Sequence, residues 1–320
     1  MLKKISIFRR ITMSLSDLED YYRQQRYIRF EQNAPLSWIR ARRWIHYALL
    51  LVLHIRQIFS GLSLTVIGDQ RKKTEHPIIY ACTHIGWDDV EIAYCALRDP
   101  SWLLLGDPRE LYKSVDGLML WINGVICCET ADKRDRYISK ETCVKLLQQG
   151  GNLLIFPEGA WNISKNLPVM KLFTGTAEMA IRTGAEIVPI AIEQYGKKYI
   201  ANIGANISCS DCKLSQKQAL TDLLRDAMCA LKWEIIEKYA ADSRSNISPD
   251  YWDNFLLSIE AQMSDSYTLE DIEITRYHDK HITESSEAFE HLQHLIPCRE
   301  NAFLFRERRC NSSKLKEDLP

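Results

Sequence analysis

A histidine stands at the point where an apolar segment of the sequence gives way to an acidic one. The stretch PIIYACT (77–83) is apolar and rich in strand-forming residues, His84 follows it directly, and Asp89 comes five residues later. A carboxylate that accepts the Nδ1 proton of a histidine leaves Nε2 free to take a proton from a hydroxyl group. Because a strand-to-helix turn can bring these two side chains together, the pair predicts a general base that deprotonates an alcohol.

Other roles for the neighbouring acidic residues remain open. Asp88 lies one position before Asp89, and it could orient His84 instead or cap the following helix. A metal site built from His84 and the three nearby carboxylates, which include Glu91, is a weaker hypothesis, because residues so close in the chain converge poorly on one ion. We therefore expect no metal.

The attacking hydroxyl is expected to belong to the substrate. The chain has no G-x-S-x-G motif, which in many hydrolases carries a nucleophilic serine. The histidine–carboxylate pair therefore predicts a direct transfer, in which an acceptor alcohol attacks an activated acyl group.

Apolar, strand-like segments alternate with amphipathic ones between residues 61 and 205. The expected strands are 62–68, 77–83, 102–106, 124–128, 152–156 and 186–192, and the expected helices are 88–97, 135–149 and 174–184. This alternation predicts an α/β domain with a largely parallel sheet flanked by helices. Pro189 lacks an N–H group, so we expect it at a sheet edge or a bulge.

Three of the expected strands end in residues that could serve a site. His84 follows one strand, Glu129 and Thr130 follow another, and Glu158 follows a third. Ligands of open α/β sheets collect at the C-terminal ends of strands. If the three strands are neighbours, these residues share one cleft.

The N-terminal fifth of the chain is basic and contains an apolar helix. Residues 1–60 hold eleven Lys or Arg and four Asp or Glu, and the run WIHYALLLVLHI (44–55) is too short to cross a bilayer. We expect a basic amphipathic helix over 38–59 that lies on a membrane, with Trp38, Arg42, Arg43 and Trp44 at the headgroup layer. The alternative is a buried helix with a solvated basic end.

The remaining segments complete the predicted organisation. Residues 1–60 form a membrane-associating helical segment, 61–205 the catalytic domain, 206–241 a packing helix, and 242–320 an acidic, partly disordered helical extension. The whole chain of 320 residues has a net charge of −1, which gives no argument for nucleic acid as a partner. Ten scattered cysteines and the lack of a recognisable signal peptide indicate a cytoplasmic protein.

In these motifs the sequence resembles the glycerolipid acyltransferase family, which includes lysophosphatidic acid acyltransferase. His84 and Asp89 match the family's H-x-x-x-x-D motif, residues 156–159 match Phe-Pro-Glu-Gly, and Val188 with Pro189 match a Val-Pro strand. The resemblance covers about residues 61–205 and implies the family's fold.

The resemblance also implies a reaction and a set of partners. His84, oriented by Asp89, would activate a hydroxyl of a lysophospholipid or related acceptor to attack acyl-CoA or acyl-ACP, a co-substrate, with no resident cofactor. The acceptor-binding residues would be Phe156, Pro157, Glu158, Gly159, Thr130 and Lys171. The enzyme would be peripheral at the inner face of the cell membrane.

Three positions depart from the family's pattern. Thr83 stands where Asn is usual, Thr130 where an acceptor-binding Arg is usual, and Ala160-Trp161 where Thr-Arg is usual. Positive charge could come instead from nearby basic residues, namely Lys133, Arg134, Arg136, Lys165 and Lys171. Otherwise the acceptor lacks a phosphate, or the protein is a lipid-binding relative with little or no catalytic activity.

Overall fold

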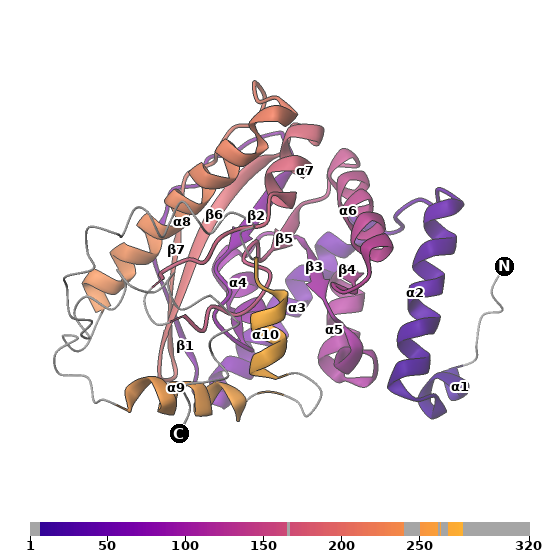
Figure 1. The fold of residues 1–320 in the computed structure, drawn as a ribbon, viewed down its shortest axis with the longest axis horizontal. Coiled ribbons are helices and arrows are strands. Elements are labelled where there is room, and N and C mark those ends of the chain that lie inside the picture. Colours follow the sequence, from indigo (N-terminus) through magenta and orange to yellow (C-terminus); the bar gives the residue numbers. More distant parts are fainter. Residues whose placement is uncertain (1–6, 165–166, 240–249, 262, 264–267, 278–320) are drawn as a thin grey trace, which may run out of the picture.

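The computed structural model describes residues 7–164, 167–239, 250–261, 263 and 268–277. Its strands are β1 (Ser63–Asp69), β2 (Ile78–Cys82), β3 (Trp102–Gly106), β4 (Val125–Cys128), β5 (Leu153–Ile155), β6 (Glu186–Tyr195) and β7 (Lys198–Ile203). They form one sheet in the order β1-β7-β6-β2-β5-β3-β4, with helices packed on both faces (Figure 1). The predicted α/β architecture with a largely parallel sheet is confirmed.

The helices of the described residues are α1 (Ile7–Thr12), α2 (Leu15–Glu31), α3 (Ile39–Ser60), α4 (Asp89–Leu97), α5 (Val115–Asn123), α6 (Lys133–Gln148), α7 (Gly175–Thr183), α8 (Lys217–Tyr239), α9 (Tyr251–Glu260) and α10 (Leu269–Thr275). Two 3₁₀ turns, η1 (Arg109–Lys113) and η2 (Leu214–Gln216), precede α5 and α8. None of these helices is both long enough and apolar enough to span a bilayer.

Strand direction defines two edges of the sheet. Strands β2, β3, β4, β5 and β6 are mutually parallel, whereas β7 is antiparallel to β6 and β1 is parallel to β7. The hairpin between β6 and β7 turns at Gly196, which has a positive φ of 61°. The C-terminal ends of β2 and its parallel neighbours therefore lie together along one side of the sheet, which we call the His84 edge. Ile78, at the N-terminal end of β2, lies on the opposite edge. These two edges are rows of strand ends and not the outer strands β1 and β4.

Alternate residues of the central strands enter two separate apolar layers. Ile79 and Ala81 pack with side chains of α6, α7 and α8, while Tyr80 and Cys82 pack with side chains of α3, α4 and α5. This alternation follows from the two-residue period of a strand, and it shows that β2 is buried on both faces. The loops that leave β2 are thus fixed by a core on either side.

Pro189 does not lie on an edge strand, but it does lie where the antiparallel pairing of β6 is interrupted: two residues of β6 (188–189) face three residues (204–206) between the Ile190–Ile203 and Ile187–Ile207 pairs, as the bulge alternative predicted. It pairs in regular register with Ala81, and β6 is an interior strand between β2 and β7. The ladder between β6 and β7 spans Ile190 to Tyr195, so Pro189 lies just outside it. Gly204 N donates to Pro189 O at 2.9 Å and the pairing resumes between Ile187 and Ile207, so the interruption needs no N–H group from Pro189.

The N-terminal helix α2 is bound to the body of the protein by ion pairs. The Arg26 guanidinium lies 2.6 Å from a carboxylate oxygen of the buried Asp135, and Arg23 pairs with Glu129. Figure 1 shows α2 beside α6. Part of the positive charge that the sequence assigned to a membrane-facing segment is therefore neutralised by carboxylates of the protein itself.

The C-terminal extension contributes two described helices, α9 and α10. Ile259 and Ile272 are buried in a cluster with Ala160, Trp161 and Met170. The predicted disorder in 242–320 concerns mainly residues outside the described part. Within that part, the extension packs on the loop that follows β5.

Candidate active site

His84 and Asp89 form a hydrogen-bonded pair at the C-terminal end of β2. The Nδ1 atom of His84 lies 2.5 Å from Oδ2 of Asp89, whose side chain is 1% exposed. The backbone N–H groups of Ile85 and Gly86 donate to the same oxygen at 3.0 and 3.3 Å. The carboxylate is thus held from two sides, and an Nδ1–H donated to it leaves Nε2 of His84 as the free base.

Asp88 has a different partner. The hydroxyl group of Tyr199, on β7, donates to Oδ2 of Asp88 at 2.9 Å. Asp88 is the N-cap residue of α4, but its side chain makes no capping hydrogen bond. Of the two candidate carboxylates, the structure therefore brings only Asp89 to His84.

The Phe-Pro-Glu-Gly turn lies directly beside this pair, because β5 neighbours β2. Glu158 is fully buried, and its two oxygens accept the backbone N–H groups of His84 at 2.9 Å and Met170 at 2.8 Å. Burial raises the pKa of Glu158, and these two hydrogen bonds and the nearby charge of Lys232 oppose the rise. Glu158 thus connects the turn, the residue before Lys171, and the backbone of His84.

Gly159 is required by the shape of the turn. Its φ is +75°, and a Cβ atom built on it would lie 2.4 Å from Cε2 of Phe173. Its N–H group donates to Phe156 O at 3.0 Å, and Phe173 N donates to Pro157 O at 2.9 Å. Both the left-handed backbone and the close approach of the Phe173 ring disfavour a side chain at this position.

Aromatic rings enclose the imidazole. The Phe156 ring stacks on His84 with centroids 4.5 Å apart, and the Trp161 ring meets His84 edge-on at 6.4 Å. Trp87 meets Trp161 edge-on at 6.3 Å and is 46% exposed. In addition, Asn162 N donates to His84 O at 2.7 Å. The loop after β5 therefore fixes both the ring and the backbone of His84.

Thr130 lies farther from His84 than the other predicted acceptor residues. Strand β4 is three strand positions from β2 in the sheet, which corresponds to roughly 14 Å between strand axes. Thr130 Oγ1 donates to Asp107 at 2.5 Å, and Arg136 donates to Thr130 O. We expected the three strand ends to share one cleft if the strands were neighbours. Only β2 and β5 are neighbours, so the end of β4 with Glu129 and Thr130 lies apart from His84.

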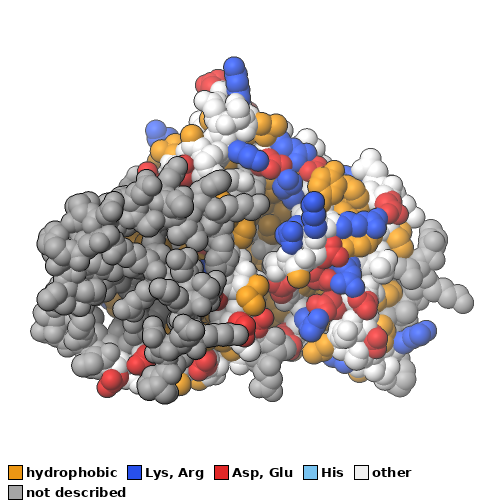
Figure 2. Space-filling view, in the orientation of Figure 1, with side chains coloured by type: hydrophobic (Ala, Val, Ile, Leu, Met, Phe, Trp, Pro, Cys, Tyr) orange, Lys and Arg blue, Asp and Glu red, His pale blue; other side chains and the backbone are white. Residues whose placement is uncertain are grey.

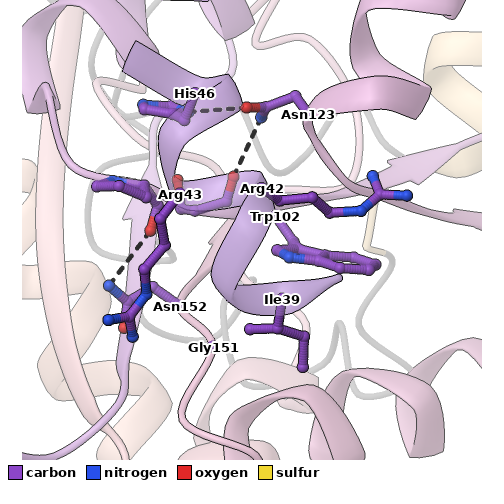
Figure 3. Close-up of a pocket in the computed structure, with 10 residues that line it drawn as sticks. Ile39, Arg42, Arg43, His46, Trp102, Asn123, Gly151 and Asn152 are labelled. Carbon is purple, nitrogen blue, oxygen red and sulfur yellow. Dashed lines mark hydrogen bonds between the residues drawn. The ribbon is translucent and has the colours of Figure 1, made fainter. Parts of the chain in front are cut away.

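The residues predicted to contact headgroups have different surroundings. Trp38 and Trp44 are largely exposed. The Arg42 guanidinium donates to Ile122 O at 3.0 Å and lies over the Trp102 ring, and Arg43 donates to Gly150 O at 3.0 Å. Figure 3 shows Arg42 and Arg43 at a small cavity of about 10 Å³. A headgroup contact by either arginine would compete with these internal bonds.

One buried charge near the site was not anticipated from the sequence. Lys232, on α8, is 4% exposed, and its Nζ donates to Ile192 O and lies 3.1 Å from Glu193 Oε2. Ile192 O also accepts the hydroxyl of Thr83, the residue before His84. The sequence around Lys232 is that of an ordinary amphipathic helix, so it does not indicate that this lysine contacts the backbone of β6 at Ile192.

Known proteins resemble this chain over the segment that contains the site. A protein-family model described as "Acyltransferase" matches residues 63–193. A 1-acyl-sn-glycerol-3-phosphate acyltransferase of Borreliella burgdorferi is 26% identical over 203 residues, which cover 60% of this chain and 77% of that protein. A protein of the same description from Chlamydomonas reinhardtii is 22% identical over 130 residues, and this chain spans only 38% of its length.

A solved structure shows the same fold. The 1-acyl-sn-glycerophosphate acyltransferase PlsC of Thermotoga maritima aligns with a TM-score of 0.51 and 14% identity, over 72% of this chain and 95% of that one. The fold and the matched segment define an acyltransferase enzyme with an open α/β sheet. The matched segment, the relatives and the fold together support a relationship to the glycerolipid acyltransferases.

Proposed function

We propose that the protein transfers a fatty acyl group from acyl-CoA or acyl-ACP to a hydroxyl of a lysophospholipid or similar glycerol phosphate acceptor. The observation that carries this proposal is the 2.5 Å contact between His84 Nδ1 and Asp89, beside the Phe-Pro-Glu-Gly turn. The B. burgdorferi and T. maritima relatives are described as acyltransferases for acceptors of this kind.

The proposed step is a direct acyl transfer. Nε2 of His84 takes the proton of the acceptor hydroxyl while the oxygen attacks the thioester carbonyl carbon. The C–S bond of the tetrahedral intermediate then breaks, and the thiolate recovers the proton from the imidazolium. Asp89 stabilises the charged imidazolium, and general base catalysis of this kind contributes about 10²–10⁴-fold to the rate.

The oxyanion of the intermediate needs a donor other than the nearest backbone groups. The N–H groups of His84, Ile85, Gly86 and Gly159 each donate to an acceptor inside the protein. Preorganised donors contribute most when they point at the developing charge. We therefore place this role on a group outside these four.

Two groups of cations are candidates to hold the acceptor phosphate: those near the start of α6, on the far side of β5 and β3 from His84, and Lys171 beside the Phe-Pro-Glu-Gly turn. Lys133, Arg134 and Arg136 are exposed near the start of α6, next to Thr130. Arg134 already pairs with Glu31, and Figure 2 shows Lys and Arg side chains over this part of the molecule, with acidic side chains among them. Lys171 is a second source of positive charge, because it follows Met170, which binds Glu158.

An acceptor without a phosphate is the second candidate. The observation that favours it is that Thr130 and Trp161 stand at the positions where the family pattern has arginines, and both are engaged within the protein. Thr130 is bonded to Asp107, and Trp161 is buried against α9 and α10. A non-catalytic lipid-binding relative is a third hypothesis, which the intact His84–Asp89 pair disfavours.

One experiment separates these hypotheses. Each reaction contains the protein and one donor, acyl-CoA or acyl-ACP. Lysophosphatidic acid is the acceptor in one set of reactions and the corresponding monoacylglycerol in a parallel set. Both free thiol and acylated lipid are measured. We expect turnover with lysophosphatidic acid and none after His84→Ala. Turnover only with the monoacylglycerol would support the second candidate, and a lack of turnover with every acceptor would contradict the enzymatic proposal.

We also propose that the protein lies on the membrane through α3 and α5, which pack against each other. The outward side of α3 carries exposed apolar residues at helical spacing, among them Trp44, Leu51, Ile55 and Phe59, and α5 adds Trp121. An amphipathic helix with this pattern suits the bilayer interface. The lipid acceptor and donor would then reach the enzyme from the bilayer, at the inner face of the cell membrane.

Co-sedimentation with lipid vesicles tests this orientation. Replacing Leu51 and Ile55 with Glu should abolish binding, because two charges would enter the apolar layer. Leu223→Glu, on the exposed side of α8, is the matched control and should bind as the wild type does. Equal binding by all three proteins would refute the proposal.

A further inference from the structure

A large polar cleft lies at the edge of the sheet opposite His84. It has a volume of about 660 Å³ and is lined by the loop that joins β1 to β2, together with residues of α3 and of the loops that precede β3 and β5. Ile78, the first residue of β2, belongs to the lining. Since β2 rises about 3.3 Å per residue, His84 lies roughly 20 Å away. No part of the proposed acyl transfer takes place here.

The loop that lines the cleft is held in one conformation by hydrogen bonds. Lys72 N donates to Asn206 Oδ1 at 2.9 Å, and Asn206 Nδ2 donates back to Lys72 O at 3.2 Å. Thr74 Oγ1 donates to Glu186 at 3.1 Å and accepts from His76 N. The backbone of the loop is thus fixed at three places, which sets where its side chains leave the chain.

Cationic side chains outnumber the anionic ones in this lining. Arg43, Arg71, Lys72 and Lys73 are basic, whereas Asp69, Glu75 and Asp99 are acidic. Two of the carboxylates are already engaged: Arg71 binds Asp69 through two nitrogens, and Tyr80 donates to Asp99. Lys72 and Lys73 are exposed and form no ion pair with any residue of the described part.

The cleft also adjoins the apolar face of α3. Tyr47 lines the cleft and is itself half exposed, and Trp44 lies one helical turn before it. Arg43 and Asn152 line both this cleft and the small cavity beside it; in Figure 3 the two side chains lie close together. A ligand in the cleft would therefore touch the helix that we propose to lie on the bilayer.

We propose that this cleft is a binding site for a phosphate-bearing ligand, separate from the acyltransfer site. A phosphate offers several acceptor oxygens and a double negative charge, which suit the ammonium groups of Lys72 and Lys73, consecutive residues beside the Arg71–Asp69 ion pair. The volume is of the size that holds a small ligand or a headgroup. The source of the phosphate is either the headgroup of an anionic lipid or a soluble phosphomonoester.

The test uses the full-length protein with Lys72 and Lys73 both replaced by Glu. The matched control is Lys213→Glu with Lys217→Glu, a pair of exposed lysines near the start of α8 that makes the same change in net charge. Binding is measured to vesicles of phosphatidylcholine with and without phosphatidic acid, and, by titration calorimetry, to glycerol 3-phosphate. The thermal unfolding temperature checks that each variant is folded.

The two sources of phosphate give different results. If the ligand is a headgroup, the cleft variant loses affinity for phosphatidic acid vesicles by about 25-fold or more, because each lost lysine is worth roughly fivefold at an anionic surface and each added glutamate is repelled; its binding to phosphatidylcholine is unchanged. If the ligand is soluble, the wild type binds glycerol 3-phosphate saturably and the cleft variant does not. The proposal is overturned if the cleft variant and the control behave alike in both assays. His84→Ala should bind as the wild type does, so failure of the acyltransferase proposal would leave this result unaffected.

Discussion

The charged side chains at the two edges of the central sheet differ in whether they have partners inside the protein. At the His84 edge, each carboxylate that touches the site has partners inside the protein: Asp89 has the imidazole and two N–H groups, and Glu158 has two N–H groups. At the other edge, Lys72 and Lys73 are exposed and unpaired within the described residues. The first arrangement suits the proton transfer that we propose at His84, and the second suits the charged ligand that we propose for the cleft.

The difference follows from what each task requires. A general base must be oriented before the substrate arrives, because a misplaced group loses much of its catalytic effect. Binding of a phosphate at a surface depends more on the local excess of positive charge than on one fixed geometry. Changes at the His84 edge should therefore alter rate or stability sharply, whereas changes at the other edge should alter affinity.

The largest expected effect comes from breaking the histidine–carboxylate pair. Asp89→Asn should lower kcat by about 10²–10⁴-fold, because the amide neither stabilises the imidazolium nor fixes its tautomer. Asp88→Asn is the matched control, since its carboxylate binds Tyr199 instead, and it should lose much less. Initial rates of thiol release measure both. If the two variants lost equal activity, the assignment of Asp89 over Asp88 would fail.

The buried Glu158 should matter for stability as well as for rate. In Glu158→Gln, one of the two N–H groups that the carboxylate accepts would face an amide NH₂, at a cost of about 1–3 kcal/mol in the free energy of unfolding. Urea denaturation measures this loss. Glu75→Gln, on an exposed loop, should leave stability unchanged, and an unaltered midpoint for both variants would refute the bridging role.

Gly159 tests the shape of the turn alone. Gly159→Ala should destabilise the protein by about 1–2 kcal/mol from the left-handed backbone, with a further cost from the Phe173 ring. Gly175→Ala is the control, because its Cβ would meet no atom within 4 Å. Thermal unfolding of both variants provides the comparison, and equal melting temperatures would show that the turn tolerates a side chain.

The smallest effect concerns a histidine that faces α5 and not the active site. Burial lowers the pKa of His46, whose Nδ1 bonds to Asn123 Oδ1 at 2.9 Å (Figure 3). The folded state therefore keeps this ring neutral, and the unfolded chain binds its proton first as the pH falls below about 6.5. His46 thus makes the free energy of unfolding decrease from pH 7.5 to pH 5.5. His46→Gln should show a shallower decrease in urea denaturation, and an identical slope would contradict this account.

Local patterns in the sequence were sufficient to predict the central part of the fold. The spacing of His84 and Asp89 and the order of apolar segments predicted a strand, a turn and a helix, which the structure contains. Strand β7 was not predicted, because KYIANI is short and contains polar residues, and its pairing with β1 and β6 is a tertiary event. The choice between an edge and a bulge at Pro189 was left open for the same reason, since only the pairing of β6 with β7 and the residues after it shows the interruption.

Contacts between distant segments explain the rest of what the sequence did not reveal. Nothing near Arg23 or Arg26 indicates that these residues pair with Glu129 and Asp135, more than 100 positions away. Likewise, Arg42 looks like a headgroup ligand in a basic stretch, yet it stacks on Trp102. The count of basic residues along the chain therefore overestimated the positive charge that α2 and α3 have available for contact with a membrane.

The most direct test of the central claim is the rate of acyl transfer by His84→Ala, measured as thiol release and lipid product under saturating donor and acceptor. The account predicts a fall of about 10²–10⁴-fold in a variant that still folds and binds vesicles, whereas His54→Ala, whose exposed side chain lies on α3, stays near wild type. A folded His84→Ala protein that transferred acyl groups at the wild-type rate would contradict it.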